Sequence, residues 1–415
     1  MPASLDPFVA LLKPLIYNGD EGVRVGGARR PAVRALDTGR RRAEIMTYLD
    51  GRILTPDGWR TGRLTFAAAI QSVAARADAP TDRFVLPGFV DLHVHGGGGH
   101  DCMAGEAAVR AMARFHARHG TTSLLATTVT APRDDLRDAF RGIGAAVRHR
   151  QPGEARVLGV HLEGPFISPD ALGAQPPFAI APDLALATEL CAIAPVRIAT
   201  IAPEIDPDHA LLRHLHGGGV RVQLGHSCAS CEQASAALEA GAAGFTHLFN
   251  AMTGMHHRRP GMVGAALAHA RHAELILDFR HVAEAAARAA LRAIPGLYGI
   301  TDAVAAAGMP AGEYRLGRHL VIKGADGVRL ADGTLAGSVL TMDQALRNFF
   351  ALGLDLEAAA RRLSSVPAAY LGQDDCGRLV PGARADLVVV DAGGRLLAVY
   401  VEGEAVELAD ARRGA

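Results

Sequence analysis

Short apolar runs alternate with Ala-rich helical stretches through most of the chain, and this alternation is the feature that most constrains the fold. The apolar runs are FVLPGFVDLHV, TSLLATTV, VLGVHLEG, VRIATIAPE, RVQLGHS, GFTHLFN, LILDF and LYGITDA. Helical stretches such as EAAVRAMARFHARHG and HVAEAAARAALRAI lie between them. A strand followed by a helix about eight times predicts a parallel α/β fold, and a (β/α)8 barrel fits the count. A doubly wound sheet is the alternative, but no Gly-x-Gly-x-x-Gly fingerprint follows an early strand.

The two ends of the chain differ from this middle. TYLDGRILTPDG and RLTFAAAIQSVA near the start, and RADLVVVDAGGRLLAVYVEGEAV near the end, are typical of short strands joined by Gly-containing turns. We therefore expect residues 46–88 and 373–415 to form one small β domain, with the barrel over residues 89–372. Residues 1–45 are rich in Arg and Gly without a clear period, and we expect them to be a disordered extension.

Charge and cysteine usage exclude several classes of protein. The 43 Lys and Arg residues balance 43 Asp and Glu residues, so no global field recruits nucleic acid or an anionic membrane. No run approaches the ~18 apolar residues of a membrane span, and the first residues make a poor signal peptide. Five cysteines, an odd number, do not indicate a secreted disulfide framework. We expect a cytoplasmic protein with no nucleic-acid or membrane partner.

Polar residues stand where the predicted strands end, and in a (β/α)8 barrel these ends converge on one site. Glu163, His226 and His247 end three different runs and make a two-histidine, one-carboxylate set that leaves room for water. His93 and His95 are separated by one residue, so both point to one face of their strand. The pattern predicts a divalent-metal hydrolase, and Asp302 after the last run is the candidate general base and acid.

Simpler interpretations exist for some of these residues. His93 and His95 could be a structural pair, and Asp302 could be the N-cap of a helix over AVAAAG. The chain has only two lysines, Lys13 and Lys323, and neither is placed to bridge two metals as a carbamylated lysine, which leaves Glu163 as the available carboxylate. Such ligands suit zinc first, but also iron, manganese or cobalt.

Six motifs in order carry a resemblance to a known family: PGFVDLHVHGGGG, GVHLEGPFISP, QLGHS, THLFNAMTGMHHRRPG, ITDAVAAAG and TLAGSVLTM. From about Met46 onward the chain resembles N-acetylglucosamine-6-phosphate deacetylases of the amidohydrolase superfamily. The resemblance implies a (β/α)8 barrel beside a small β-sandwich, one or two divalent metals per subunit, a homodimer, and release of acetate from N-acetylglucosamine 6-phosphate. It places Glu163, His226 and His247 in the principal metal site, His93 and His95 in a second, and Asp302 as the base.

The resemblance also implies contacts with the sugar phosphate. These fall on Asn250, Ala251, His257, Arg258, His281, Ala174, Gln175, Leu335 and Ala336. Arg258 is expected to reach the site of the neighbouring subunit, although from the residues alone HHRR is equally typical of a solvated basic loop.

The chain departs from the family pattern at a few positions. Gln175 stands where a histidine is usual, which keeps N-acetylgalactosamine 6-phosphate, or another N-acyl substrate, as an alternative. Phe279 and Arg280 replace small residues, and Arg280 is a further candidate for the phosphate. A non-catalytic sugar-phosphate sensor is the alternative of a different class; it would be expected to lose Asp302 or the metal ligands, and this chain has kept them.

Overall fold

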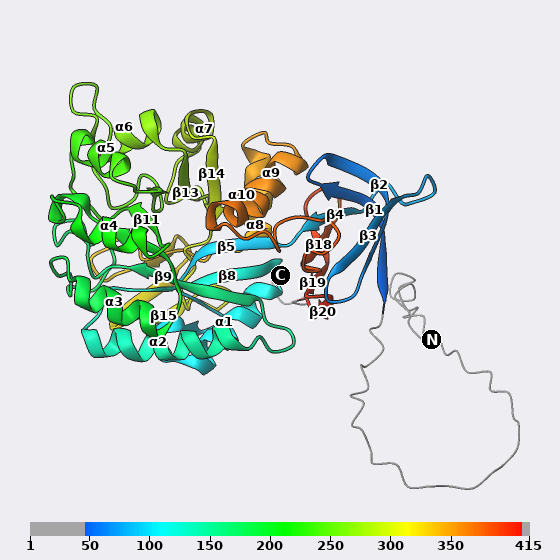
Figure 1. Ribbon diagram of the computed structural model, residues 1–415, viewed down its shortest axis with the longest axis horizontal. Coiled ribbons are helices and arrows are strands. Elements are labelled where there is room, and N and C mark those ends of the chain that lie inside the picture. Colours follow the sequence, from blue (N-terminus) through cyan, green and yellow to red (C-terminus); the bar gives the residue numbers. More distant parts are fainter. Residues whose placement is uncertain (1–45, 409–415) are drawn as a thin grey trace, which may run out of the picture.

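The computed structural model describes residues 46–408 as two bodies, a barrel and a β-sheet domain, which lie side by side (Figure 1). Residues 1–45, which we expected to be a disordered extension, lie outside the described residues. So do residues 409–415 of the expected C-terminal segment.

The barrel confirms the predicted fold class. Its eight-stranded sheet runs in chain order, and each apolar run of the sequence supplies one strand. The ring is completed between the first and last strands, where Val94 and Ala303 pair in parallel and Asp302 N–H donates to His93 O at 2.9 Å. The strands are β5 (Phe89–Val94), β8 (Thr121–Thr128), β9 (Arg156–Glu163), β10 (Val196–Ile201), β11 (Arg221–Leu224), β12 (Gly244–Phe245), β13 (His272–Ile276) and β14 (Gly296–Ile300).

Helices cover the outside of the barrel, each with an apolar face turned inward. In α2, for example, Leu136, Phe140 and Ile143 recur at helical spacing and are fully buried against the strands. The helices are α1 (Glu106–Ala117), α2 (Arg133–Arg148), α3 (Leu184–Ile193), α4 (Ala210–Gly217), α5 (Cys231–Glu239), α6 (Gly261–His269), α7 (Glu284–Ala293), α8 (Met342–Ala351), α9 (Leu356–Leu363) and α10 (Ser365–Leu371), with short 3-10 turns at Cys102–Ala104 and Pro203–Ile205.

Both ends of the described chain meet in the second body, a seven-stranded sheet of order β20-β19-β18-β4-β1-β2-β3. The sheet curls around its own core, since the rings of Phe66 and Tyr400 lie 5.2 Å apart on strands that are not neighbours, and Ile70 N–H donates to Ala383 O. The strands are β1 (Thr47–Thr55), β2 (Gly58–Phe66), β3 (Ile70–Ala75), β4 (Phe84–Pro87), β18 (Leu387–Val390), β19 (Leu396–Val401) and β20 (Glu404–Val406).

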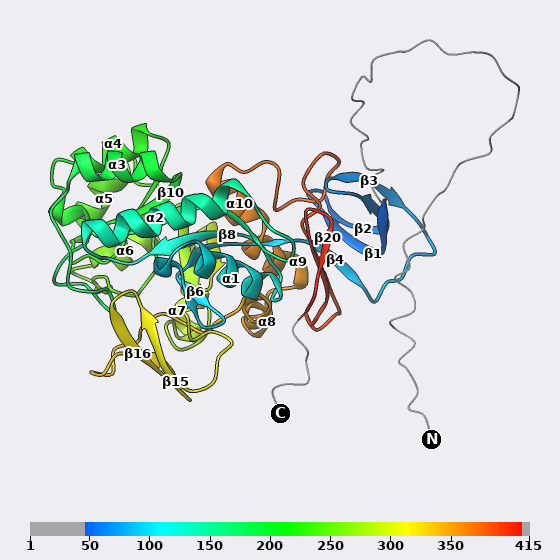
Figure 2. The same ribbon diagram turned by 90° about the horizontal axis from the view of Figure 1, so that it is seen from below.

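Two small antiparallel sheets decorate the barrel. A three-stranded sheet follows β14 and projects from the barrel as a separate flap (Figure 2). It consists of β15 (Gly312–Leu316), β16 (His319–Gly324) and β17 (Gly327–Arg329), and a two-residue pair, β6 (Gly96–Gly97) and β7 (His100–Asp101), follows β5. Over residues 46–408, none of the helices combines the length and the apolar character that crossing a bilayer requires.

Candidate metal and catalytic site

The candidate residues stand at, or just beyond, the C-terminal ends of barrel strands. Glu163 is the last residue of β9, and His226, His247 and Asp302 each follow the end of their strand by two residues. These three have positive φ angles of 47°, 27° and 49°. Left-handed backbone at a residue other than glycine costs roughly 1–3 kcal/mol and is concentrated at functional sites. Here it turns three polar side chains into the mouth of the barrel.

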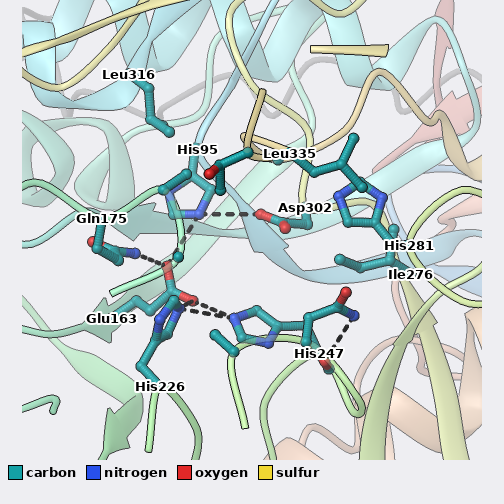
Figure 3. A pocket seen from close by; sticks show the side chains of 16 residues that line it. His95, Glu163, Gln175, His226, His247, Ile276, His281, Asp302, Leu316 and Leu335 are labelled. Atoms are coloured by element: carbon teal, nitrogen blue, oxygen red, sulfur yellow. Dashed lines mark hydrogen bonds and ion pairs between the residues drawn. The ribbon is translucent and has the colours of Figure 1, made fainter. Parts of the chain in front are cut away.

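A first cluster joins Glu163, His226 and His247. Glu163 Oε1 lies 3.1 Å from His226 Nε2 and 2.9 Å from His247 Nε2, and the two imidazole nitrogens are 3.0 Å apart (Figure 3). All three side chains are buried. Glu204 accepts a hydrogen bond from the hydroxyl of Ser227, the residue after His226. This contact restrains the loop after β11 and with it the position of His226.

A second cluster lies on the other side of the same carboxylate. Glu163 Oε2 is 3.2 Å from His95 Nε2, which is 3.2 Å from His93 Nε2 and 3.2 Å from Asp302 Oδ1. Glu163 therefore lies between the two histidine pairs: Oε2 faces His95, while Oε1 faces the first pair and is also 3.4 Å from His93 Nε2. A central position of Glu163 is what we expected from the sequence, because neither lysine is placed to bridge two metals.

The donor set fits a divalent cation. His226 Nδ1 contacts the carbonyl of Ala171, His95 Nδ1 that of Thr127, and His93 Nδ1 the carboxylate of Glu274, all at 2.9–3.0 Å. A neutral imidazole that donates through Nδ1 presents a lone pair at Nε2. Lone pairs facing each other at about 3 Å repel unless a positive charge stands between them, and histidines held in this way by a second partner are typical of metal ligands.

Glu274, which the sequence analysis missed, supports both clusters. This fully buried carboxylate of β13 accepts from His93 Nδ1 at 2.9 Å and from the backbone N–H of His247 at 3.2 Å. His161 Nδ1 lies 3.9 Å from Glu274 Oε1, and its ring contacts the Leu92 carbonyl and the Thr200 hydroxyl. The available signal was an acidic residue inside the apolar run AELILDF.

Asp302 faces the second cluster rather than a helix. Ala303 forms β-bridges with Val94 and Ser338, and a turn over residues 305–308 follows in place of a helix, so the alternative of a helix N-cap is wrong. Burial raises the pKa of Asp302, but the adjacent His93 and the hydrogen bond with His95 outweigh it and hold the pKa below its usual value. An ionised carboxylate that borders the cluster is suited to accept a proton.

A pocket of about 210 Å3 opens above these clusters. Of the predicted substrate contacts it brings together Ala174, Gln175, Asn250, Ala251, His281 and Leu335. Leu316 and Thr334 also line it, and neither was predicted. Leu316 belongs to the flap, which lies outside the strand-helix repeat. His281 Nδ1 contacts Asp278 at 2.7 Å; burial lowers the pKa of His281, but this carboxylate outweighs it and raises the pKa. One wall of the pocket therefore favours an anion.

Other predicted contacts lie elsewhere. His257 and Arg258 are exposed on the loop before α6, and Ala336 is fully buried; none of the three lines the pocket. Arg280 donates to the Ala325 carbonyl, and it does not line the pocket either. Lys323 donates to the carbonyls of Ala306 and Met309, which agrees with its exclusion as a bridging ligand.

A (β/α)8 barrel with a buried imidazole and carboxylate cluster at its C-terminal mouth defines a metal-dependent hydrolase. A family model described as the amidohydrolase family matches residues 84–406. The chain belongs to this family, and within it to the N-acetylglucosamine-6-phosphate deacetylases.

Individual relatives place the chain more closely. It is 41% identical to N-acetylglucosamine-6-phosphate deacetylase of Lysinibacillus sphaericus, over 74% of this chain and 82% of that protein. It is 40% identical to N-acetylgalactosamine-6-phosphate deacetylase of Escherichia coli O157:H7, over 85% of this chain and 97% of that protein. A solved structure of an N-acetyl-D-glucosamine-6-phosphate deacetylase variant from Mycobacterium smegmatis, in complex with N-acetyl-D-glucosamine-6-phosphate, superposes with a TM-score of 0.81 at 36% identity, over 87% of this chain and all of that one.

Proposed function

We propose that this chain hydrolyses N-acetylglucosamine 6-phosphate to glucosamine 6-phosphate and acetate, in amino-sugar catabolism or recycling. The observation that carries the proposal is the convergence of Glu163, His226 and His247 on one point, with Asp302 across the same pocket. The relatives that cover most of the chain are deacetylases of N-acetylhexosamine 6-phosphates. The alternative of a non-catalytic sensor loses support, because Asp302 and the ligand set are intact and face one another.

The residues divide the reaction between them. Glu163, His226 and His247 would hold a divalent cation, which would supply Lewis acidity to the attacking water and to the acetamide carbonyl. Asp302 takes the proton that the attacking water loses and delivers it to the sugar nitrogen as the carbon–nitrogen bond breaks. Acetate and the free amine then leave. Gln175 holds the second oxygen of Glu163 through its side-chain amide, so the carboxylate keeps its orientation.

The sugar phosphate fits the pocket through its polar wall. His281, made more basic by Asp278, attracts the phosphate, while Asn250 and the backbone at Ala251 face the sugar. Ala174 and Leu335 supply apolar lining, and Ala336 is buried next to Leu335 in the chain. His257 and Arg258 are exposed, and we propose that they complete the phosphate site of a second subunit in a homodimer.

The finer assignments are part of the same proposal. Imidazole and carboxylate ligands favour zinc, with iron, manganese or cobalt as alternatives. His93 and His95 would hold a second cation, with Glu163 between the two. A cytoplasmic location is consistent with five free cysteines, Cys102, Cys191, Cys228, Cys231 and Cys376.

N-acetylgalactosamine 6-phosphate is the second candidate substrate. The relative that acts on it shares 40% of residues and is covered over 97% of its length. The two sugars differ only in the configuration of one hydroxyl, so contacts of the pocket wall, with Gln175 among them, decide between them. A comparison of kcat/KM for both phosphates and both unphosphorylated sugars separates the candidates.

The test combines metal analysis with one substitution. The purified chain should contain at least one divalent ion per subunit and release acetate, and chelation should abolish the release until metal is restored. Asp302→Asn should lower kcat by at least about a thousandfold while metal content and thermal stability stay near wild type. Turnover by a metal-free chain, or by Asp302→Asn, would contradict the proposed roles.

A further inference from the structure

A second cavity, of about 370 Å3, opens at the opposite end of the barrel. Its lining comes from the beginnings of strands: Arg221 is the first residue of β11, and Arg271 and His272 stand at the start of β13. His269 at the end of α6 and Tyr370 of α10 complete the polar lining. In a parallel barrel the strand beginnings and the strand ends lie at opposite mouths. This cavity is therefore separated from the catalytic pocket by the length of a strand, roughly 15 Å.

The cavity carries positive charge without compensation. No Asp or Glu lines it. Within residues 46–408, the side chains of Arg221 and Arg271 enter no hydrogen bond or ion pair. The guanidinium carbon of Arg221 lies 5.7 Å from the centre of the Tyr370 ring. Most arginines of the barrel helices behave differently: Arg110, Arg137 and Arg288 each pair with a carboxylate. The net charge of the chain is zero, so this accumulation is local.

The remaining lining determines what kind of anion fits. The cavity also contains Leu238, Ala242, Ala243 and Ala369, which give it a small apolar wall. His272 is half-buried, and its ring lies 5.0 Å from that of Tyr370, so an aromatic face and a ring N–H border the charged part. Guanidinium groups bind phosphate oxygens through paired donors, and the volume exceeds that of a bare phosphate.

We propose that this cavity is a binding site for a phosphate group, free or as part of a small phosphate ester, separate from the catalytic pocket. Arg221 and Arg271 hold the phosphate oxygens, His269 and His272 add donors, and the alanine wall accommodates the remainder of an ester. The site rests on residues that take no part in deacetylation, so it stands or falls independently of the proposed reaction.

The test uses the metal-loaded full chain and titration calorimetry at low ionic strength, with inorganic phosphate in one arm and glycerol 3-phosphate in the other. The probe variant is Arg221→Gln/Arg271→Gln, which keeps the aliphatic stems and removes two charges. The control is Arg118→Gln/Arg148→Gln, because Arg118 just after α1 and Arg148 at the end of α2 are exposed and have no side-chain hydrogen bond or ion pair in residues 46–408. It removes the same charge from the surface.

We expect wild type and the control to show a phosphate-binding component that the probe variant weakens at least about tenfold. The kcat and KM of deacetylation should be the same in all three proteins at saturating metal. Tighter binding of glycerol 3-phosphate identifies an ester as the ligand, and equal or weaker binding identifies free phosphate. The proposal is overturned if the probe variant binds both ligands as wild type does, or if the control loses affinity to the same extent.

Discussion

Gln175 connects Glu163 to the backbone of a neighbouring barrel loop. Its Nε2 donates to Glu163 Oε2, and its Oε1 accepts from the backbone N–H of Thr130 at 2.6 Å. The side chain is buried, so both ends of the amide are used and neither is free to rotate. The carboxylate is thereby held with its other oxygen toward His226 and His247.

Replacing this amide should disturb the carboxylate before it disturbs the fold. Gln175→Ala leaves Thr130 N–H without its acceptor and frees Glu163 Oε2, so we expect metal affinity to fall about 10–100-fold and kcat to fall with it. Metal titration and steady-state kinetics with both hexosamine phosphates measure the effect. Gln344→Ala, at an exposed glutamine of α8, is the matched control. Unchanged metal affinity in Gln175→Ala would show that Glu163 holds its place alone.

Glu274 should act through the histidines that it contacts. In Glu274→Gln the charge is lost while the volume is kept, so His93 Nδ1 and His247 N–H meet a weaker acceptor. We expect a loss of about 10–100-fold in metal affinity, with a smaller change in KM. Tyr298→Phe removes the longer contact with Glu274, at 3.4 Å, and the hydroxyl that accepts from Gln223 Nε2, which keeps Tyr370 as a second partner. It touches none of the candidate ligands and should leave the metal affinity near wild type. Equal effects of the two changes would indicate a general packing defect instead.

The fold and the convergence of the candidate ligands could be predicted because they depend on local patterns. Each of the eight apolar runs became one barrel strand, and the ends of parallel strands must meet at one mouth. Glu163, His226, His247 and Asp302 followed those ends in the sequence, so their convergence needed no knowledge of packing.

The remaining parts of the site depend on contacts that no local pattern reveals. Glu274 lies within an apolar strand, and only the closed barrel shows that it faces His93. Leu316 reaches the pocket from a flap that has no place in the repeat. Arg258 is exposed in one chain, so a role for it requires a second chain.

A homodimer that shares residues makes a specific kinetic prediction for Arg258. Arg258→Ala should raise KM for the phosphorylated sugar about tenfold or more and leave kcat nearly unchanged, since a phosphate contact is equal in ground and transition states. Arg259→Ala, the adjacent exposed arginine, is the control. A normal KM in Arg258→Ala would remove its role at the phosphate.

Mixing two defective chains tests whether Arg258 crosses between subunits. A dimer of one Asp302→Asn chain and one Arg258→Ala chain contains one site with both residues intact, so random mixing should restore about a quarter of wild-type activity at low substrate concentration. Asp302→Asn alone should stay inactive, and Arg258→Ala alone should keep about a tenth or less of wild-type activity at low substrate concentration. No recovery after confirmed subunit exchange would place Arg258 outside the partner's site.

His116 should make stability depend on pH. It is fully buried in α1, its Nε2 contacts the Gly96 carbonyl at 2.9 Å, and burial lowers its pKa to about 4. The unfolded chain protonates its histidines near pH 6.5, about 2.5 units higher. Above pH 6.5 His116 is neutral in both states. Below it, the unfolded state alone takes up the proton, so the free energy of unfolding falls as the pH decreases toward 4.

One substitution measures how much of the pH dependence of the free energy of unfolding comes from His116. His116 contributes about 1.4 kcal/mol per pH unit in this window, and His161, whose pKa burial also lowers to about 4, adds in the same direction. His116→Gln keeps a donor for the Gly96 carbonyl but does not titrate. Its free energy of unfolding should therefore change less with pH, by the contribution of one proton, about 1.4 kcal/mol per pH unit. Urea unfolding of metal-free protein between about pH 7 and pH 5 measures the difference without interference from metal loss. Equal slopes in wild type and His116→Gln would mean that His116 binds its proton equally well in the folded and unfolded chain.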